Sequence, residues 1–132
     1  MSIKVGIIVV DSQAQFAHEN LSPLSESLRL MGCSEQNILV RHSPSIYNVP
    51  LTVQFFAEYT DVDAVVILTE SNNSPEYSAM LNGVNKLQIA WNMPVCVGDC
   101  TAASEAVEMV SIQNQMEAEA PEHISPDRKS IN

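Results

Sequence analysis

Val5-Gly6-Ile7-Ile8-Val9-Val10 is the stretch that decides the fold. It is continuously apolar and mostly β-branched, which is typical of a strand buried on both faces of a parallel sheet. Ala64–Leu68 and Val95–Val97 have the same character, and a shorter strand, Ile38–Val40, follows Gly32 and a polar turn. We therefore predict a sheet that is covered by other elements on both of its faces.

Helical spacing fills the gap between the first two predicted strands. One apolar stripe recurs there every three to four residues and ends before Gly32, which suits the position after a helix end. Its members are Phe16, Leu21, Leu24, Leu28 and Met31. Pro23 lies inside the stretch and leaves two interpretations open. Either it kinks the helix, or Ser22-Pro23 begins the regular part.

Three further helices are predicted from their first residues. Pro50 opens a short one that carries Val53, Phe56 and Ala57. Ser74-Pro75-Glu76 combines an N-cap serine, a proline at N1 and a carboxylate at the positive end of the helix dipole. The apolar face expected to follow it comprises Tyr77, Met80, Leu81, Val84, Leu87 and Trp91. Thr101 is expected to cap a last helix that runs to about Glu119.

The last helix carries two apolar stripes. One is expected to face the sheet: Ala103, Ala106, Val107 and Val110. The other falls on nearly the opposite side: Ala102, Met109, Ile112 and Met116. A monomer would leave this second stripe in water, so it favours a homo-oligomer, although a deeply packed helix has the same pattern.

Strands and helices alternate, which predicts one α/β domain over residues 1–119: a three-layer sandwich with a four-stranded parallel sheet flanked by helices. Residues 120–132 turn polar and lose periodicity, so we expect a poorly ordered tail there.

Composition excludes several classes of protein. Six basic and sixteen acidic residues give a formal net charge of −10, which disfavours binding to nucleic acid or to anionic membranes. No apolar run has the roughly 18–20 residues of a membrane span, and no signal peptide is recognisable. Cys33, Cys96 and Cys100 are too few for a disulfide scaffold and lack zinc spacing, so we expect small buried side chains, no metal site and a cytoplasmic protein.

Ligands of open parallel sheets bind beyond the carboxyl ends of the strands. Arg41 and His42 follow the second predicted strand. Arg41 is the one basic residue placed to bind a phosphate, and His42 could transfer protons; both could equally be solvated loop residues. The acidic residues at the strand ends could bind a divalent cation, although polar loops commonly carry such residues. They are Asp11, Glu70 and Asp99.

Four segments in order resemble the lumazine synthases, between about residues 3 and 110. Residues 9–16, VVDSQAQF, lie where that family has a strand ending in Arg-Phe-Asn. Residues 44–51, PSIYNVPL, resemble its Pro-Gly-Ala-Phe-Glu-Ile-Pro-Leu, and residues 63–68, DAVVIL, resemble its Asp-Ala-Val-Ile-Ala-Leu-Gly strand. Residues 93–98, MPVCVG, followed by Thr101, are similar to its Val-Pro-Val-Ile-Phe-Gly-Val-Leu-Thr.

The resemblance implies a flavodoxin-like strand order, homopentamers and ligand sites between subunits. It also implies synthesis of 6,7-dimethyl-8-ribityllumazine from a ribitylamino-pyrimidinedione and a dihydroxybutanone phosphate, in riboflavin biosynthesis. The resemblance and the strand ends together predict seven ligand-binding positions: Gln13, Arg41, Tyr47, Asn48, Asn72, Asn73 and Thr101.

Several departures from the family pattern concern its chemistry. Gln13 replaces the aromatic residue that stacks on the pyrimidine, and Asn48 replaces the glutamate of the proline motif. The interval from Leu68 to Pro94 is shorter than in the family and contains neither arginine nor histidine. The family histidine therefore corresponds to Asn72 or Glu76.

Three hypotheses follow. The first is a lumazine synthase-like protein without this synthesis, acting as an oligomeric assembly or as a binder of a flavin- or pterin-type heterocycle. The second is an enzyme of altered chemistry that uses Arg41, His42, Asn48 or Glu76. The third is a lumazine synthase that retains its activity with unusual residues. No cofactor is expected beyond a bound flavin or lumazine.

Overall fold

Four parallel strands form a single sheet, in a computed structural model that describes residues 2–120. They are β1 (Val5–Val10), β2 (Ile38–Ser43), β3 (Ala64–Leu68) and β4 (Val95–Gly98). Their order is β2-β1-β3-β4, so the predicted α/β fold is confirmed. β2 is longer than expected because it pairs with β1 over its whole length, from Val5 opposite Ile38 to Val10 opposite Ser43.

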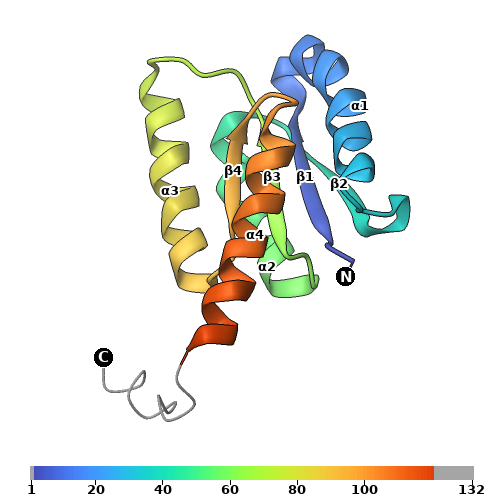
Figure 1. Ribbon diagram of the computed structural model, residues 1–132. Coiled ribbons are helices and arrows are strands. Elements are labelled where there is room, and N and C mark those ends of the chain that lie inside the picture. Colours follow the sequence, from blue (N-terminus) through green and yellow to red (C-terminus); the bar gives the residue numbers. More distant parts are fainter. Residues whose placement is uncertain (1, 121–132) are drawn as a thin grey trace, which may run out of the picture.

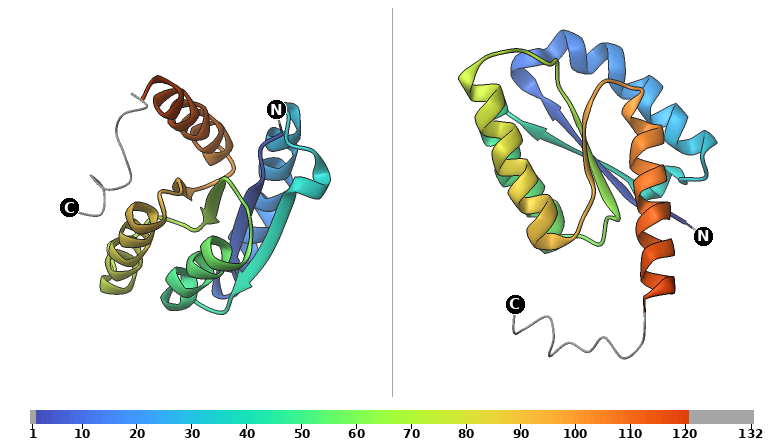
Figure 2. Two further views of the ribbon diagram at one scale, coloured as in Figure 1. Left: turned by 90° about the horizontal axis from the view of Figure 1, so that it is seen from below. Right: turned by 60° about the vertical axis from the view of Figure 1, so that its left-hand side comes forward.

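Two helices cover each face of the sheet (Figure 1 and Figure 2). α1 (Ala14–Leu30) and α4 (Ala102–Glu119) pack on one face. α2 (Val49–Tyr59) and α3 (Pro75–Trp91) pack on the other. This is the three-layer sandwich expected from the alternation of elements. It leaves β2 and β4 as the two edge strands, each between a pair of helices.

β1 lies in the middle of the sheet and separates two apolar cores. Its side chains alternate, so that Ile7 belongs to the core under α1 and α4, while Ile8 belongs to the core under α2 and α3. Gly6 faces Phe56 of α2 so closely that a Cβ atom at residue 6 would lie 2.7 Å from Cε1 of the Phe56 ring. Because Gly6 has no side chain, α2 can pack closely against the sheet at this point.

The helices follow the predicted pattern with several corrections. α1 begins at Ala14 and continues through Pro23, so the interpretation in which Ser22-Pro23 begins the helix is wrong. Gly32 has a φ of 104°, which glycine adopts without strain, as expected after a helix end. Leu81 and Trp91 were expected on the apolar face of α3, yet they are 37% and 42% exposed. That face is centred instead on Met80 and Val84, which are both buried.

The starts of α3 and α4 differ in their capping. The Ser74 hydroxyl accepts a hydrogen bond from the Tyr77 amide at 3.1 Å, which confirms the predicted cap of α3. Thr101 precedes α4, but its hydroxyl makes no cap and instead donates to Oδ1 of Asp99 at 2.6 Å. The predicted cap at Thr101 is therefore wrong. Ala102, expected on the outer stripe, is buried against the sheet.

The expected polar tail lies almost wholly outside the described residues, including His123, Arg128 and Lys129. α4 ends at Glu119, as its periodicity predicted. Within residues 2–120, no helix is long and apolar enough to cross a membrane. Cys33 and Cys96 are buried and Cys100 is half-buried, and all three thiols are free.

Candidate functional site

The carboxyl ends of the four strands are connected to one another by hydrogen bonds. The Ser12 amide, after β1, donates to the Pro44 carbonyl oxygen, after β2, at 3.1 Å. The Thr69 amide, after β3, donates to the Gly98 carbonyl oxygen at the end of β4 at 3.2 Å. The loops therefore form one continuous rim, at the edge where open parallel sheets bind ligands.

Gln13 joins the rim between β1 and β3. Its side-chain oxygen Oε1 accepts a hydrogen bond from the Glu70 amide at 3.0 Å and another from the Thr69 hydroxyl at 3.1 Å. Thr69 is 2% exposed, so this contact satisfies a buried hydroxyl. A residue predicted to bind a ligand thus holds the loop after β3 against the loop after β1.

Asp11 and His42 join the rim between β1 and β2. Nδ1 of His42 lies 2.8 Å from Oδ1 of Asp11, although 31 residues separate the two in sequence. The parallel register explains the contact, because Val9 lies opposite His42 and Asp11 follows shortly after. Both residues were predicted at the strand ends, but no sequence spacing indicated a carboxylate partner for His42. Only the strand pairing reveals the pair.

Arg41 precedes His42 on β2, which is an edge strand of the sheet. Its guanidinium lies 5.6 Å from the centre of the Phe55 ring of α2, and Nη1 donates to the Val40 carbonyl oxygen at 2.8 Å. A hollow of about 580 Å³ is lined by Arg41 and His42 together with Phe55, Leu51 and Tyr59 of α2. The one cation predicted for a phosphate therefore lies over an aromatic ring beside α2.

The predicted amide residues are bonded within their own loops. Oδ1 of Asn48 accepts from the Ser45 amide at 3.3 Å and from the Ser45 hydroxyl at 3.1 Å. Oδ1 of Asn72 accepts from the Ser74 amide at 2.8 Å. Tyr47 is 80% exposed, in the short 3₁₀ turn Ile46–Asn48. These contacts shape the two loops before α2 and α3.

Asn73 and Glu76 complete the set that was expected around the loop after β3. Both are exposed, and Glu76 lies in the first turn of α3. The loop that contains Asn73, Thr69–Ser74, has no cationic side chain. An anionic ligand would therefore meet backbone amides and neutral polar side chains on this part of the rim, together with the acidic side chains of Glu70 and Glu76, and no cation.

Asp11 and Asp99, two of the acidic side chains at the rim, are bonded to different partners. Asp99 accepts from the Thr101 amide at 2.9 Å and from the Thr101 hydroxyl, and these bonds hold the pKa of Asp99 below its usual value. Asp11 is paired with His42. Over residues 2–120, no group of three or more histidine, cysteine, aspartate or glutamate side chains is arranged to hold a metal ion.

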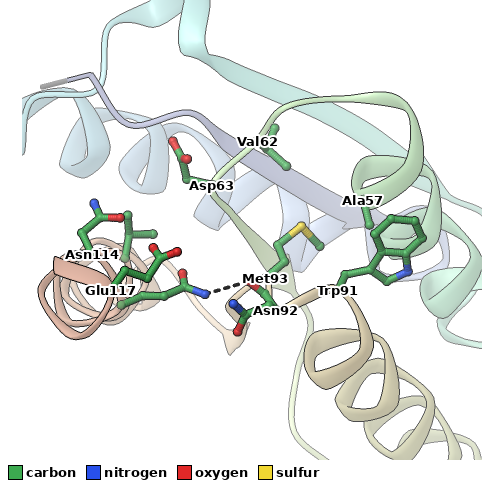
Figure 3. Close-up of a pocket in the computed structure, with 10 residues that line it drawn as sticks. Ala57, Val62, Asp63, Trp91, Asn92, Met93, Asn114 and Glu117 are labelled. Atoms are coloured by element: carbon green, nitrogen blue, oxygen red, sulfur yellow. Dashed lines mark hydrogen bonds between the residues drawn. The ribbon is translucent and has the colours of Figure 1, made fainter. Parts of the chain in front are cut away.

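A separate hollow of about 280 Å³ lies at the opposite, amino-terminal edge of the strands (Figure 3). Asp63 and Glu117 line one side of it and Trp91 the other, and Nε2 of Gln113 donates to the Asn92 carbonyl oxygen at 2.7 Å. Asp63 already accepts the Lys4 amide at 2.9 Å. None of the predicted site residues belongs to this hollow.

The chain is similar to a lumazine synthase. It is 26% identical over 102 residues to 6,7-dimethyl-8-ribityllumazine synthase of Bacteroides fragilis (strain YCH46). The matched region covers 73% of this chain and 71% of that protein. No protein-family model matches the chain. The similarity indicates a distant relation to the lumazine synthases, and the four-stranded α/β sandwich agrees with it.

Proposed function

We propose that the chain is a lumazine synthase-like protein that no longer makes 6,7-dimethyl-8-ribityllumazine. It forms a cyclic homo-oligomer instead. This oligomer serves either as an assembly protein or as a binder of a flavin- or pterin-type heterocycle. The hydrogen bonds of Gln13 carry the proposal. At residue 13 the resemblance places an aromatic ring that stacks on the substrate, whereas here the side chain is a glutamine that is bonded to the loop after β3.

The Gln13 side chain differs from an aromatic ring in both its shape and its role. Its amide offers no ring face for a heterocycle, and its oxygen is already used by Thr69 and Glu70. Swinging the amide toward a ligand would leave the nearly buried Thr69 hydroxyl and the Glu70 amide without this acceptor. Each lost bond costs on the order of 1 kcal/mol. The Gln13 side chain is therefore more stable in its observed conformation, bonded to Thr69 and Glu70, than turned toward a ligand.

The loop Thr69–Ser74 supports the loss of synthesis. The resemblance places a phosphate-binding arginine and a proton-transferring histidine there, and this loop has neither. General acid–base groups typically contribute about 10²- to 10⁴-fold in rate. Glu76 has a carboxylate at the start of α3, which would oppose an incoming phosphate.

Two different apolar patches support the homo-oligomer. The first, here the α2 patch, is a row of exposed side chains spaced four residues apart beside edge strand β2: Tyr47, Leu51, Phe55 and Tyr59. The second, here the α3–α4 patch, lies beside edge strand β4: Ile89, Ile112 and Met116. Contact of one patch with the other is head-to-tail, which closes into a ring when the rotation allows it.

The remaining parts of the proposal follow the resemblance. It gives the ring five subunits and places the heterocycle between neighbours, at the rim that contains Gln13, Asn48 and Asn72. We place the protein in the cytoplasm, for which the free thiols of Cys33 and Cys96 are the support.

An activity assay tests the lost synthesis. The purified chain is incubated with the ribitylamino-pyrimidinedione and the dihydroxybutanone phosphate, and product is followed by its visible absorbance. We expect formation no faster than in buffer alone. The B. fragilis enzyme serves as the positive control, and synthesis by this chain clearly above the background would refute the proposal.

A binding assay then separates the two remaining roles. Riboflavin is titrated into the oligomer, and quenching of its fluorescence is measured. Saturable quenching supports a heterocycle-binding role at the rim, whereas its absence leaves the assembly role.

A further inference from the structure

β4 is the shortest of the four strands and one of the two edges of the sheet. The carbonyl oxygens of Pro94 and Gly98 accept hydrogen bonds from amides on or directly after β3, at 2.9 and 3.2 Å. Backbone groups alternate in direction along a strand, so those of Val95 and Val97 face away from β3. Through such outward groups an edge strand can pair with another chain.

Gln88 of α3 bonds one of these outward groups. Its side-chain oxygen Oε1 accepts a hydrogen bond from the Val95 amide at 2.8 Å. Its side-chain nitrogen Nε2 donates to Oδ1 of Asn85, three residues earlier on the same helix, at 3.4 Å. Both ends of the side-chain amide are therefore bonded, which holds Gln88 against the edge of β4.

A hollow of about 400 Å³ lies beside the start of β4, between α3 and α4. Gln88 lines it together with Met93 and Pro94, which directly precede the strand, and with Ile89 and Met109 from the two helices. The helices therefore leave room for another chain at this end of the edge.

β4 itself carries none of the usual protection of an edge strand. Charged side chains, proline and bulges commonly keep such strands from pairing with other molecules. The residues of β4 are Val-Cys-Val-Gly, without charge or proline. On β2, the other edge strand, Nη1 of Arg41 donates to the Val40 carbonyl oxygen at 2.8 Å. A side chain thus bonds a backbone group on each edge strand.

We propose that Gln88 closes the β4 edge against strand addition by a second copy of this chain. Its Oε1 occupies the place that the carbonyl oxygen of an added strand would take at the Val95 amide. A second copy is the relevant partner, because an uncharged apolar strand can pair with its own copy without charge repulsion between the two strands. This contact differs from the head-to-tail ring, and the closure holds with or without that ring.

Gln88→Ala and Gln88→Met test the closure, because both remove the acceptor and the second keeps the length of the side chain. Hydrogen exchange of the Val95 amide is expected to become at least about fivefold faster. Light scattering is expected to give a mass that rises with concentration above that of the unmodified chain. In the associated material, exchange of the Val97 amide slows at least about fivefold, because its N–H is then bonded to the added strand.

Two sets of variants serve as controls. Gln88→Glu retains an oxygen acceptor, so its Val95 amide is expected to exchange as slowly as in the unmodified chain. Gln15→Ala and Gln15→Met make the same replacements on α1, where Gln15 donates to the Glu19 side chain at 3.0 Å, and they are expected to keep the unmodified mass. Circular dichroism verifies that each variant is folded.

Three results would overturn the proposal: a folded Gln88→Ala variant that keeps the unmodified mass at every concentration, an unchanged Val95 amide in that variant, or associated material in which the Val97 amide still exchanges fast. None of them bears on the synthesis assay or on the riboflavin titration. Each variant is compared with the unmodified chain, so the test is equally decisive if that chain is a monomer. Failure of the closure and failure of the proposed function are therefore distinguishable.

Discussion

Among residues 2–120, the thiol of Cys96 has a strongly raised pKa. It lies on β4, only 5% exposed. Burial, reinforced by the negative charge of Glu105, raises the pKa of its thiol from about 9 to about 12. In the unfolded chain the thiol ionises at its ordinary pKa, so stability is fully present below pH 9 and is lost as the pH rises toward 12.

The first prediction concerns Cys96→Ala. The unmodified chain is expected to lose stability progressively above pH 9, whereas the variant loses less over the same range. At neutral pH the variant is less stable by about 1 kcal/mol, because it removes a buried group. Urea-unfolding midpoints measured from pH 7 to pH 11 check both statements. Cys100→Ala is the control, and an equal pH slope in the Cys96 variant would contradict the account.

The residue scale also shows what sequence can and cannot predict. Burial of Cys33 and Cys96 was predictable from type and context. The Asp11–His42 contact was not, because it spans 31 residues and depends on how β1 pairs with β2. The two hydrogen bonds of Gln13 depend in the same way on the placement of β3 beside β1.

At the scale of the elements, the seating of α2 on the sheet depends on Gly6 and Phe56. Any side chain at residue 6 would meet three atoms of the Phe56 ring at 2.7–2.9 Å. Phe56 is fully buried, so the ring has little room to move. Forced overpacking of this kind typically costs about 1–3 kcal/mol.

The second prediction is therefore that Gly6→Ala destabilises the chain by about 1–3 kcal/mol. Phe56→Leu makes room, so the double variant is expected to be more stable than the sum of the two single effects implies. Urea unfolding of all four proteins measures this coupling. Gly98→Ala is the matched control, because its Cβ would find its nearest neighbour, the Cβ of Ala102, at 4.0 Å. Strict additivity at residues 6 and 56 would rule the contact out.

Elements were predictable where a periodic pattern extended over a whole strand or helix. β1 and β3 followed from continuous apolar runs, and α3 from its N-cap serine and N1 proline. The errors arose at single positions where tertiary contacts overrode local preference. Asp99 takes the Thr101 hydroxyl away from a capping role, and α1 continues past Pro23.

At the scale of the whole molecule, the α2 patch and the α3–α4 patch lie at opposite edges of one sheet. Because the patches differ, each subunit would offer one surface to each of two neighbours. Sequence indicated the part of the second patch on α4 from its helical spacing. It did not indicate the α2 patch as exposed, since outward orientation depends on how α2 packs beside α3.

The third prediction tests this arrangement. Leu51→Glu and Ile112→Glu each place a charge in one patch, so each variant alone is expected to be monomeric by light scattering. Mixed together, they retain one intact α2 patch and one intact α3–α4 patch between them, and a heterodimer is expected. Leu30→Glu, on α1 and 79% exposed, is the control and keeps the mass of the unmodified protein.

If light scattering shows that the unmodified chain is a monomer, the proposed ring of subunits is refuted. A mixture of the two variants that stays monomeric would contradict contact between the two patches. A single variant that still dimerises alone would instead indicate an interface in which like patches meet, because its intact patch could pair with a second copy of itself.

The hydrogen bonds of Gln13 set a limit on redesign. Introducing phenylalanine there would supply a ring face and at the same time deprive Thr69 and Glu70 of their acceptor. The benefit and the damage arise from the same substitution, so residue 13 is epistatic with the loop after β3. An engineering path toward synthesis must therefore replace residue 13 and this loop together, since either change alone passes through a less stable intermediate.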